Sequence, residues 1–496
     1  MRFRLSPSGC SGRDIIVPTK YFTYRTLEDI RRDVKERGLA IAFEENLQAI
    51  MQPVRVGQRT IGNSLGIHPM EGCDGTLEGK PGELTFRRWE SFGRGGAKLI
   101  WGEATAVAPE GLANPRQLLI NGENLRDFES LLQRTRTAHR EMYGQDNDLL
   151  VGLQLTHSGR YSYRTPLIAY HHPQADQATF LDKHKGILLP PEYPVVTDEY
   201  LEKLEDTYLE AAVRACKVGF DFIDIKQCHT YLLNELLGAR QRQGKYGGSF
   251  ENRTRLVRNI LKRIKNELGD KIILASRVNA FDGVPFEKDS LTGIGMPLPF
   301  ALPYEYSFGV DRNDPLKEDL TEPLALVRML CDLGVKMINV SMGSPYYNMH
   351  YGRPFEVTPT DGYLQPEHPL VGVERHFRIT GKVQEAFPDL VVVGTGYSWL
   401  QKFLINAAES NLRRKRVTIV ATGRGAIAYP EYANDALTLG ELKSSRVCLA
   451  VSYCTNLMRA KDNELGQYPA GCAPRDSVYG AIYKEVLAKQ KHMKEA

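Results

Sequence analysis

Short apolar runs alternate with amphipathic segments along most of this chain. The run at 149–155, Leu-Leu-Val-Gly-Leu-Gln-Leu, has the length and composition of a strand buried on both faces. The segment 198–217 instead spaces its apolar residues as a helix with one covered face does. The alternation predicts strands at 65–70, 97–103, 149–155, 220–225, 271–277, 335–340, 390–394 and 416–421, and helices at 82–95, 121–143, 198–217, 250–268, 321–334, 370–386, 397–409 and from Gly423 onward.

Strands that alternate regularly with helices predict an α/β protein with an all-parallel sheet. Eight such units favour closure into a (β/α)8 TIM barrel, although the periodicity is also consistent with a doubly wound open sheet. We assign the barrel to residues 52–440. Residues 1–51 are an N-terminal extension with a helix capped at Thr26, and residues 441–496 are a short C-terminal helical tail.

The composition, 42% hydrophobic and 25% charged with a net charge of +4, is ordinary for a globular protein. This charge is too small and too dispersed to favour a nucleic-acid partner, and no stretch approaches the roughly 20 apolar residues that span a bilayer. Residues 1–10 lack the apolar core of a signal peptide, and the eight cysteines are scattered. We therefore expect a cytoplasmic protein with no membrane or nucleic-acid partner.

Two inserts, 158–197 and 279–320, each follow a predicted strand and are rich in aromatic residues and proline. Loops of this length over a barrel mouth serve as substrate lids or as contacts between subunits. Both interpretations stay open, and contacts between subunits would make the protein a homo-oligomer.

Three reactive side chains follow the predicted strand 220–225, namely Lys226, His229 and Tyr231. A cation, an imidazole and a phenol at the carboxyl end of a barrel strand can stabilise an oxyanion and transfer a proton. A paired lysine and a core histidine would give the same pattern, so these residues alone do not decide between the two.

Polar and glycine-rich positions mark four other strand ends. Gly394-Thr395-Gly396 and Gly423-Arg424 could bind a phosphate through backbone N–H groups and a guanidinium, or form two tight turns. Gln154 could bind the edge of a heterocycle, and Arg277 could stabilise an anionic ring or belong to an ion pair.

Together these motifs, in this order, resemble the old yellow enzyme family, the FMN-dependent NADH:flavin oxidoreductases that include enoate and 2,4-dienoyl-CoA reductases. The resemblance covers residues 52–440, and the run Tyr-Gly-Gly-Ser-Phe-Glu-Asn-Arg at 246–253 is highly specific to the family. The other matching segments are His-Pro-Met at 68–70, Gly-Glu-Ala-Thr-Ala-Val at 102–107, residues 154–160, residues 226–232, Arg277, residues 394–396 and residues 423–424.

The resemblance implies a barrel that holds FMN noncovalently at its mouth, with NADH or NADPH as the reductant and a small organic molecule as the substrate. The family transfers a hydride from the flavin to an alkene conjugated to a carbonyl group, an ene-reductase reaction, and a tyrosine commonly protonates the α-carbon. The implied flavin contacts are Pro69, Met70 and Ala104 along the isoalloxazine, Gln154 at its pyrimidine edge, Arg277 near N1 and O2, and Gly394, Thr395, Gly396, Gly423 and Arg424 at the phosphate.

Two catalytic positions depart from the family pattern. Lys226 stands where the family has the first histidine of an oxygen-binding pair, whereas His229 and Tyr231 are kept. Glu71 follows Pro-Met, where the family often has a small residue. Opposite charges at two family positions suggest a neutral Glu71–Lys226 ion pair. Lys226 could instead bind an anionic substrate directly or form a Schiff base.

The tail carries Cys448, Cys454 and Cys472, where larger family members bind an iron–sulfur cluster. Val451 occupies the place of an expected fourth ligand, so we interpret the cysteines as relicts that hold no metal. A cluster with a non-cysteine ligand is the alternative. We expect no further nucleotide-binding domain before Ala496.

The leading hypothesis is an FMN-dependent NAD(P)H oxidoreductase with Lys226, His229, Tyr231 and Glu71 as the catalytic residues. A close alternative is a flavin-dependent dehydrogenase that oxidises a ring, an amine or a hydroxylated substrate, with Glu71 or His229 as the base. Two further alternatives are a lyase that forms a Schiff base on Lys226 without a flavin and a non-catalytic flavin-binding protein.

Overall fold

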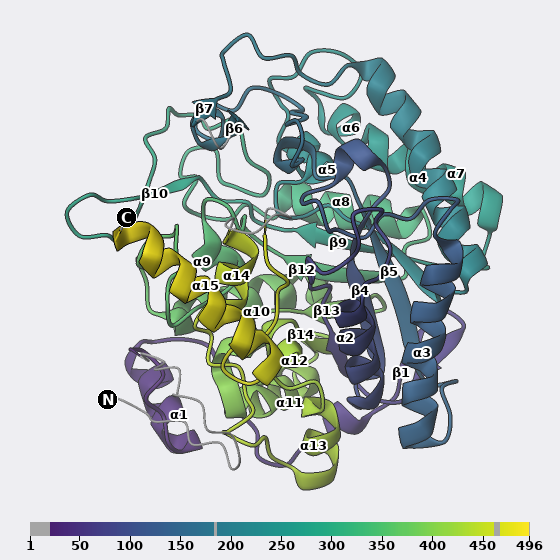
Figure 1. Cartoon of the computed structure of the whole chain (residues 1–496), viewed down its shortest axis with the longest axis vertical. Coiled ribbons are helices and arrows are strands. Elements are labelled where there is room, and N and C mark those ends of the chain that lie inside the picture. Colours follow the sequence, from purple (N-terminus) through teal and green to yellow (C-terminus); the bar gives the residue numbers. More distant parts are fainter. Residues whose placement is uncertain (1–19, 183–185, 461–466, 496) are drawn as a thin grey trace.

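The fold is a closed parallel barrel surrounded by helices, described by a computed structural model for residues 20–182, 186–460 and 467–495 (Figure 1). Neighbouring strands follow the order β12-β13-β14-β3-β4-β5-β8-β9, and every pair is parallel. Closure confirms the predicted barrel over an open sheet. The strands are β3 (Leu65–Ile67), β4 (Leu99–Ala106), β5 (Leu150–Thr156), β8 (Phe222–Ile225), β9 (Ile273–Asn279), β12 (Met337–Ser341), β13 (Val391–Gly394) and β14 (Ile419–Thr422).

The predicted helices lie around the barrel with bounds close to those expected, but two are interrupted. The segment 250–268 divides at Thr254 into α6 (Phe250–Arg253) and α7 (Arg255–Leu268). The segment from Tyr397 begins as a 3-10 helix with a kink at Gln401 before α11 (Leu404–Arg413). The remaining ring comprises α2 (Glu83–Arg94), α3 (Leu125–Tyr143), α4 (Asp198–Val218), α8 (Thr321–Asp332), α10 (Pro369–Ala386) and α12 (Arg424–Ala428).

The N-terminal segment packs on the late part of the barrel. Thr26 caps α1 (Leu27–Glu36) through the predicted capping box. The Glu356 carboxylate accepts hydrogen bonds from the backbone N–H groups of residues 20–22, and Lys402 donates to the Arg25 carbonyl at 2.7 Å. The stretch 40–52 contains one 3-10 turn, Ala49–Met51.

A hairpin that the hydrophobic pattern did not reveal closes the amino-terminal end of the barrel. Its strands β1 (Val54–Val56) and β2 (Arg59–Ile61) pair antiparallel. Val56 and Ile61 are fully buried against the starts of the barrel strands, including Phe222 and Met337. Each strand has only three residues, too few for an alternating pattern to stand out.

The two inserts contain small hairpins and contact each other beyond the carboxyl ends of the strands. The first insert holds β6 (Phe180–Asp182) and β7 (Ile187–Leu188), and the second holds β10 (Phe286–Lys288) and β11 (Gly295–Pro297). The Gln174 amide joins them, because it donates to the Pro299 carbonyl at 2.9 Å and accepts from the Tyr304 hydroxyl at 2.6 Å.

The tail contributes α14 (Tyr453–Arg459) and α15 (Ser477–Glu495), the yellow helices in Figure 1. Tyr468, Tyr479 and Tyr483 form a small cluster against which Leu84 of α2 packs. Ala470 N–H also donates to the Gly72 carbonyl at 2.7 Å, so the tail rests on the loop that follows β3.

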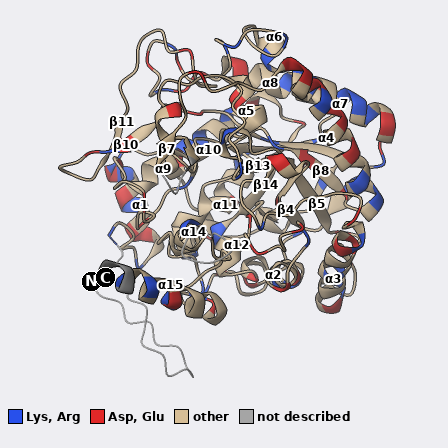
Figure 2. Ribbon diagram, turned by 45° about the horizontal axis from the view of Figure 1, so that its top comes forward, with Lys and Arg blue, Asp and Glu red and all other residues tan. Residues whose placement is uncertain are grey.

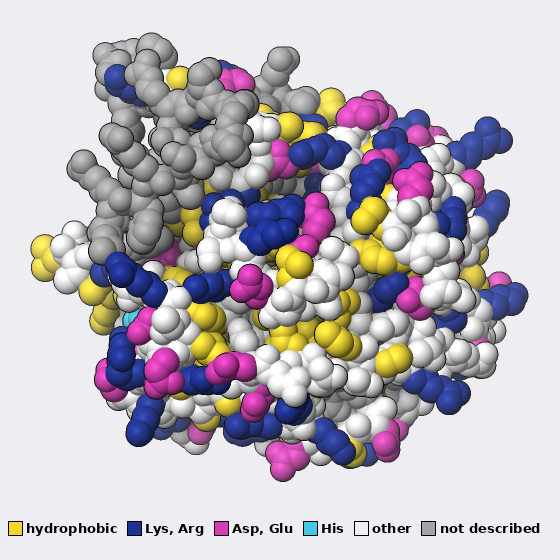
Figure 3. All heavy atoms as spheres, turned by 90° about the horizontal axis from the view of Figure 1, so that it is seen from below, with side chains coloured by type: hydrophobic (Ala, Val, Ile, Leu, Met, Phe, Trp, Pro, Cys, Tyr) yellow, Lys and Arg dark blue, Asp and Glu magenta, His cyan; other side chains and the backbone are white. Residues whose placement is uncertain are grey.

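Charges of both signs are interspersed on the outer helices, including α3, α4 and α7 (Figure 2), and on the face seen from below (Figure 3). This mixture agrees with the small net charge and gives these surfaces no field of a single sign. None of the helices in the described ranges combines the length and hydropathy needed to cross a membrane.

Candidate active site

All of the predicted site residues lie on the carboxyl-terminal halves of barrel strands or in the loops that follow them. Glu71 follows β3, while Lys226, His229 and Tyr231 follow β8. The predicted flavin contacts lie on or after β3, β4, β5, β9, β13 and β14. Because all strands are parallel, these ends meet at one mouth.

Lys226 lies over an aromatic ring. Its Nζ is 3.8 Å from the centroid of the Tyr231 ring, a cation–π contact. The Tyr231 hydroxyl is 3.1 Å from that of Tyr346, whose ring stacks on Tyr161 with centroids 3.6 Å apart. Burial lowers the pKa of Lys226, although the nearby Cys228 thiol and Glu71 act in the opposite direction.

Glu71 does not form the ion pair that we expected. Among the residues that the structure describes, Glu71 Oε1 accepts a hydrogen bond from the Asn114 amide, and no ion pair within 4.0 Å joins Glu71 to Lys226. Burial raises the pKa of Glu71 to about 7, and the electrostatic influence of Lys226 partly opposes this rise. The expected direct pair is therefore not formed, although Lys226 still acts electrostatically on Glu71. The Asn114 amide is a hydrogen-bond partner of Glu71, and Lys226 lies over the Tyr231 ring.

His229 is a half-buried imidazole held by an unusual backbone. Burial and the charges of Arg277 and Lys226 hold its pKa well below the usual range, and Nε2 lies 3.0 Å from the Ser341 hydroxyl at the end of β12. His229 and Thr230 have φ angles of 65° and 58°, a left-handed conformation that costs non-glycine residues about 1–3 kcal/mol. Thr230 N–H donates to Asn234 Oδ1 at 2.6 Å and helps to hold this turn.

A buried carboxylate, Asp224 on β8, orients two of the predicted flavin contacts. It accepts hydrogen bonds from Gln154 Nε2 at 2.5 Å, from Arg277 N–H at 2.7 Å and from Trp101 Nε1 at 2.8 Å. The Gln154 amide is thereby fixed. Arg277 Nε is buried and has no hydrogen-bond partner among the described residues, so it is a donor available to a ligand.

The two glycine motifs form a tight cradle. A Cβ on Gly423 would lie 2.6 Å from Met70 Sδ, and a Cβ on Gly396, where φ is 97°, would lie 2.8 Å from His376. Only glycine fits either position without displacement. Between them, the Thr395 hydroxyl donates to the carbonyl of Val340, which fixes the loop after β13.

Two guanidinium groups at this cradle have unfilled hydrogen-bonding capacity. Arg424 Nη2 donates to the Pro354 carbonyl at 2.7 Å, but its buried Nη1 has no partner among the described residues. Arg353 Nε and Nη2 are likewise buried and have no partner among the described residues. Burial, followed by the charges of Arg424 and Arg459, lowers the pKa of Arg353 to about 9. A phosphate dianion fits this pair, because it accepts several hydrogen bonds and relieves the repulsion.

The sequence did not single out Asn114, Asp224, Tyr346 or Arg353. Asp224 left a usable signal, since it is a lone carboxylate in the apolar run Phe-Ile-Asp-Ile. The other three lie in irregular loops, where no hydrophobic period indicates which side chain turns inward.

The tail cysteines lie near one another and near Arg424. Burial raises the pKa values of Cys448 and Cys472, and each thiol also responds to the charge of Cys454. Within the described ranges, no group of three or more His, Cys, Asp or Glu side chains has a metal-binding arrangement.

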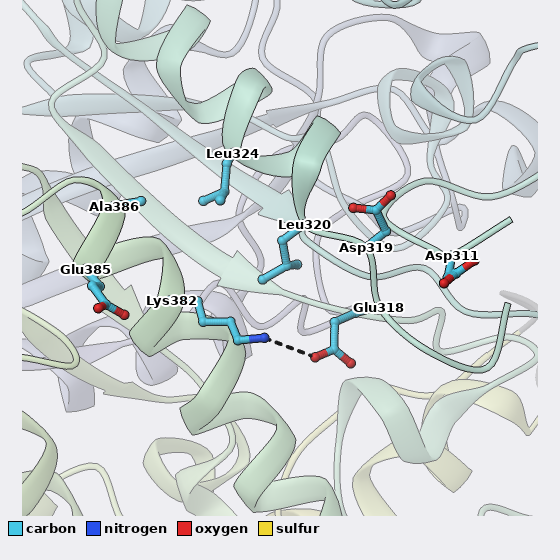
Figure 4. A pocket seen from close by; sticks show the side chains of 8 residues that line it. All are labelled: Asp311, Glu318, Asp319, Leu320, Leu324, Lys382, Glu385 and Ala386. Carbon is cyan, nitrogen blue, oxygen red and sulfur yellow. Dashed lines mark ion pairs between the residues drawn. The ribbon is translucent and has the colours of Figure 1, made fainter. Parts of the chain in front are cut away.

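A surface pocket between α8 and α10 lies apart from the mouth (Figure 4). It is lined mainly by acidic and aliphatic side chains, and Lys382 lies 3.6 Å from Glu318 within it. It contains none of the predicted site residues, so it does not compete with the mouth as the candidate active site.

The chain is similar in sequence to known flavin oxidoreductases. The family model described as the NADH:flavin oxidoreductase / NADH oxidase family matches residues 49–295. NADH:flavin oxidoreductase FG08077 of Gibberella zeae is 31% identical over 261 residues, which are 50% of this chain and 56% of that protein. An NADPH dehydrogenase of Halalkalibacterium halodurans is 32% identical over 212 residues, which are 42% of this chain and 56% of that protein. The chain thus spans little more than half the length of these relatives.

A solved structure supports the fold. The old yellow enzyme homologue from Zymomonas mobilis superposes with a TM-score of 0.56 at 19% identity, covering 80% of this chain and 95% of that one. At this identity the likeness establishes the barrel fold alone. Taken with the matched segment 49–295, it leads to one conclusion: the chain belongs to the NADH:flavin oxidoreductase / NADH oxidase family, the family of old yellow enzyme.

Proposed function

We propose that this chain is an FMN-dependent oxidoreductase that uses NADH or NADPH to reduce an activated alkene. Family membership supports the cofactor and the nicotinamide. The substrate class is our inference from the groups at the mouth. When bound, FMN supplies a two-electron hydride carrier that neither protein side chains nor water can provide.

The observation that carries the proposal is the Arg353–Arg424 pair, because three of its donor atoms are buried and have no partner among the described residues. Each unsatisfied buried donor costs about 1–3 kcal/mol, so the pair calls for an anion. We assign the FMN phosphate to these two arginines and to the cradle of Gly394, Thr395, Gly396 and Gly423.

The loop after β3 and the ends of β4, β5 and β9 supply the residues that would hold the isoalloxazine ring. We assign the contacts along the ring to Pro69, Met70 and Ala104. Gln154, fixed by Asp224, would bind the pyrimidine edge, and the Nε–H of Arg277, which has no partner among the described residues, would donate to the ring's anionic side.

The residues after β8 would hold the substrate and complete the reaction. Lys226 and His229 would donate to the oxygen of a carbonyl or carboxylate conjugated to the alkene, drawing electron density from the β-carbon. Tyr231 would then give its phenolic proton to the α-carbon. One hydride and one proton add across the C=C bond, and the nicotinamide loses the two electrons that the alkene gains.

The first test is a visible spectrum of the purified protein, followed by anaerobic addition of NADH and then NADPH. We expect a yellow protein whose flavin bleaches with one or both nicotinamides and regains its colour when an α,β-unsaturated acid or ketone is added. A protein that is colourless and cannot be reconstituted with FMN would refute the proposal. In that case, inactivation by borohydride with substrate would support Schiff-base formation on Lys226.

One observation favours a second candidate function, oxidation of an amine or hydroxylated substrate. Glu71 has a pKa of about 7 at the mouth and could accept a proton from such a substrate. This function predicts a flavin that neither nicotinamide bleaches and that an amine or alcohol does bleach. The same anaerobic titration therefore separates the two directions. Bound flavin that no donor reduces would indicate a non-catalytic flavin-binding protein.

A further inference from the structure

The C-terminal tail reaches the candidate active site through a short chain of hydrogen bonds. Gln467 Nε2 donates to Asn114 Oδ1 at 2.7 Å, and the Asn114 amide donates to Glu71 Oε1. We propose that Gln467 and Asn114 are positioning residues that set the protonation of Glu71, so that the tail is a working part of the site. The inference rests on the proposed function only where it gives Glu71 a role in proton transfer.

The orientation of the Asn114 amide follows from its neighbours. Asn114 Oδ1 also accepts the backbone N–H of Arg116 at 3.0 Å, and a backbone N–H can only donate. The atom between Arg116 and Gln467 is therefore the oxygen, and the NH2 group faces Glu71. Asn114 consequently stabilises the carboxylate form of Glu71, against the effect of burial.

The tail also covers the loop of Glu71 and limits the access of water to this half-buried side chain. Gln467 is only 7% exposed, and Ala470 N–H bonds to the carbonyl of Gly72, the residue after Glu71. The cluster of Tyr468, Tyr479 and Tyr483 anchors this part of the tail against α2. Because burial is the main reason that the pKa of Glu71 is raised, a wall made by the tail contributes directly to that rise.

The other groups that face Glu71 come from the barrel. Lys226 favours the carboxylate, whereas Glu103 on β4 and Asp74 on the same loop oppose it. Glu71 also interacts with the Cys73 thiol and with the phenols of Tyr231 and Tyr346. Among these six coupled groups none belongs to the tail, so the tail acts through Gln467 and through the exclusion of water.

The two positioning residues therefore have effects of opposite sign. Asn114→Leu removes a donor to the carboxylate and should raise the pKa of Glu71 by about one unit. Gln467→Ala opens the wall and should lower it by a similar amount. A residue that only held the fold together would not produce opposed shifts at a distant carboxyl group.

A matched control exists on the same tail. Asp476 forms an ion pair with Arg87 on α2 at 2.7 Å, and Arg87 is half-exposed. Asp476→Asn weakens the contact between tail and barrel without touching the Glu71 chain. We expect it to leave the titration of Glu71 in place.

The experiment is a pH titration of the carboxylic-acid band in infrared difference spectra of the full-length, flavin-loaded protein, with Glu71→Gln to assign the band. Opposite shifts in Asn114→Leu and Gln467→Ala, with none in Asp476→Asn, support the inference. Shifts of equal sign, no shift, or an equal shift in the control would overturn it. Nicotinamide bleaching, measured on the same samples, reports separately on the proposed function, because the carboxyl band titrates whether or not the flavin is reduced.

Discussion

The two ends of the barrel differ in the side chains that they hold, which are apolar at one end and charged at the other. At the amino-terminal end, the β1–β2 hairpin packs Val56 and Ile61 against apolar strand starts with no solvent access. At the carboxyl-terminal end, Lys226 and Arg277 are buried and Arg353 is half-buried, and burial lowers the pKa values of all three cations. The amino-terminal end therefore contributes stability. The carboxyl-terminal end holds buried charges that destabilise the fold when no ligand is bound.

The difference indicates where a ligand belongs. Donors on Arg277, Arg353 and Arg424 have no partner in the part of the chain that the structure describes, and each costs about 1–3 kcal/mol. The left-handed turn at His229 adds a similar amount. A fold can carry such costs at a mouth when its other end is well packed. An anionic ligand that fills these donors would stabilise the protein as it binds.

The largest effect should come from Tyr231→Phe at the mouth. Loss of the phenolic proton should slow substrate reduction by about 10²–10⁴-fold, the usual contribution of a general acid. Bleaching of the flavin by NAD(P)H should continue at its original rate, because that half-reaction needs no such proton. Stopped-flow measurement of both half-reactions separates them, and an unchanged rate of substrate reduction would remove Tyr231 from the mechanism.

At the opposite end, Ile61→Ala should lower the free energy of unfolding by about 2–5 kcal/mol, the cost of a cavity in a fully buried site. FMN affinity and both half-reactions should stay unchanged below the melting temperature. Denaturant unfolding and a flavin-binding titration check the two statements. Val213→Ala, on the exposed face of α4, is the matched control and should have little effect. A loss of flavin binding in Ile61→Ala would break the contrast between the two ends.

A smaller effect is expected for Arg424→Lys. The charge is retained, but the planar fork that donates to Pro354 and leaves Nη1 for a phosphate is lost. We expect FMN to bind about 10–100-fold more weakly, the worth of one charge-assisted hydrogen bond. Fluorescence titration of the apoprotein with FMN measures this change. Arg214→Lys, in an ion pair with Glu210 on α4, should leave the affinity intact.

The barrel could be predicted from the sequence because its strands are buried on both faces. Runs such as 149–155 stay apolar throughout, and the helices between them keep a clear period. The β1–β2 hairpin could not be found in this way, since its strands are too short to show a period. Its role depends on long-range packing against Phe222 and Met337.

Some residues of the candidate site could likewise be predicted from the sequence, and others could not. Lys226, His229, Tyr231 and Arg277 lie on or just after strands, so a correct strand assignment also located them at the mouth. The expected Glu71–Lys226 contact was wrong because charge alone does not fix a partner. Asn114, from a loop after β4, reaches Glu71 first.

The smallest effect that we predict concerns the pH dependence of stability. Glu71 has a pKa of about 7 in the fold and an ordinary value near 4.5 in the unfolded chain. Between these values the folded state holds a proton that the unfolded state has released, so stability falls as the pH rises through this window. Glu71→Gln removes this dependence, so its stability relative to that of the unchanged protein should increase above neutrality.

We compare the free energy of unfolding of Glu71→Gln with that of the unchanged protein at each pH. This difference should shift in favour of Glu71→Gln by about 1–2 kcal/mol between about pH 5 and about pH 8. This value is less than the full shift in pKa would give, because Glu71 is partly accessible to water. Glu129→Gln, on the exposed side of α3, removes the same charge far from the mouth and should show no such gain. Equal curves for both variants would mean that Glu71 ionises as freely in the fold as outside it. Ionisation of Glu71 would then cost no stability, and this carboxyl group would not contribute to the contrast between the mouth and the hairpin end.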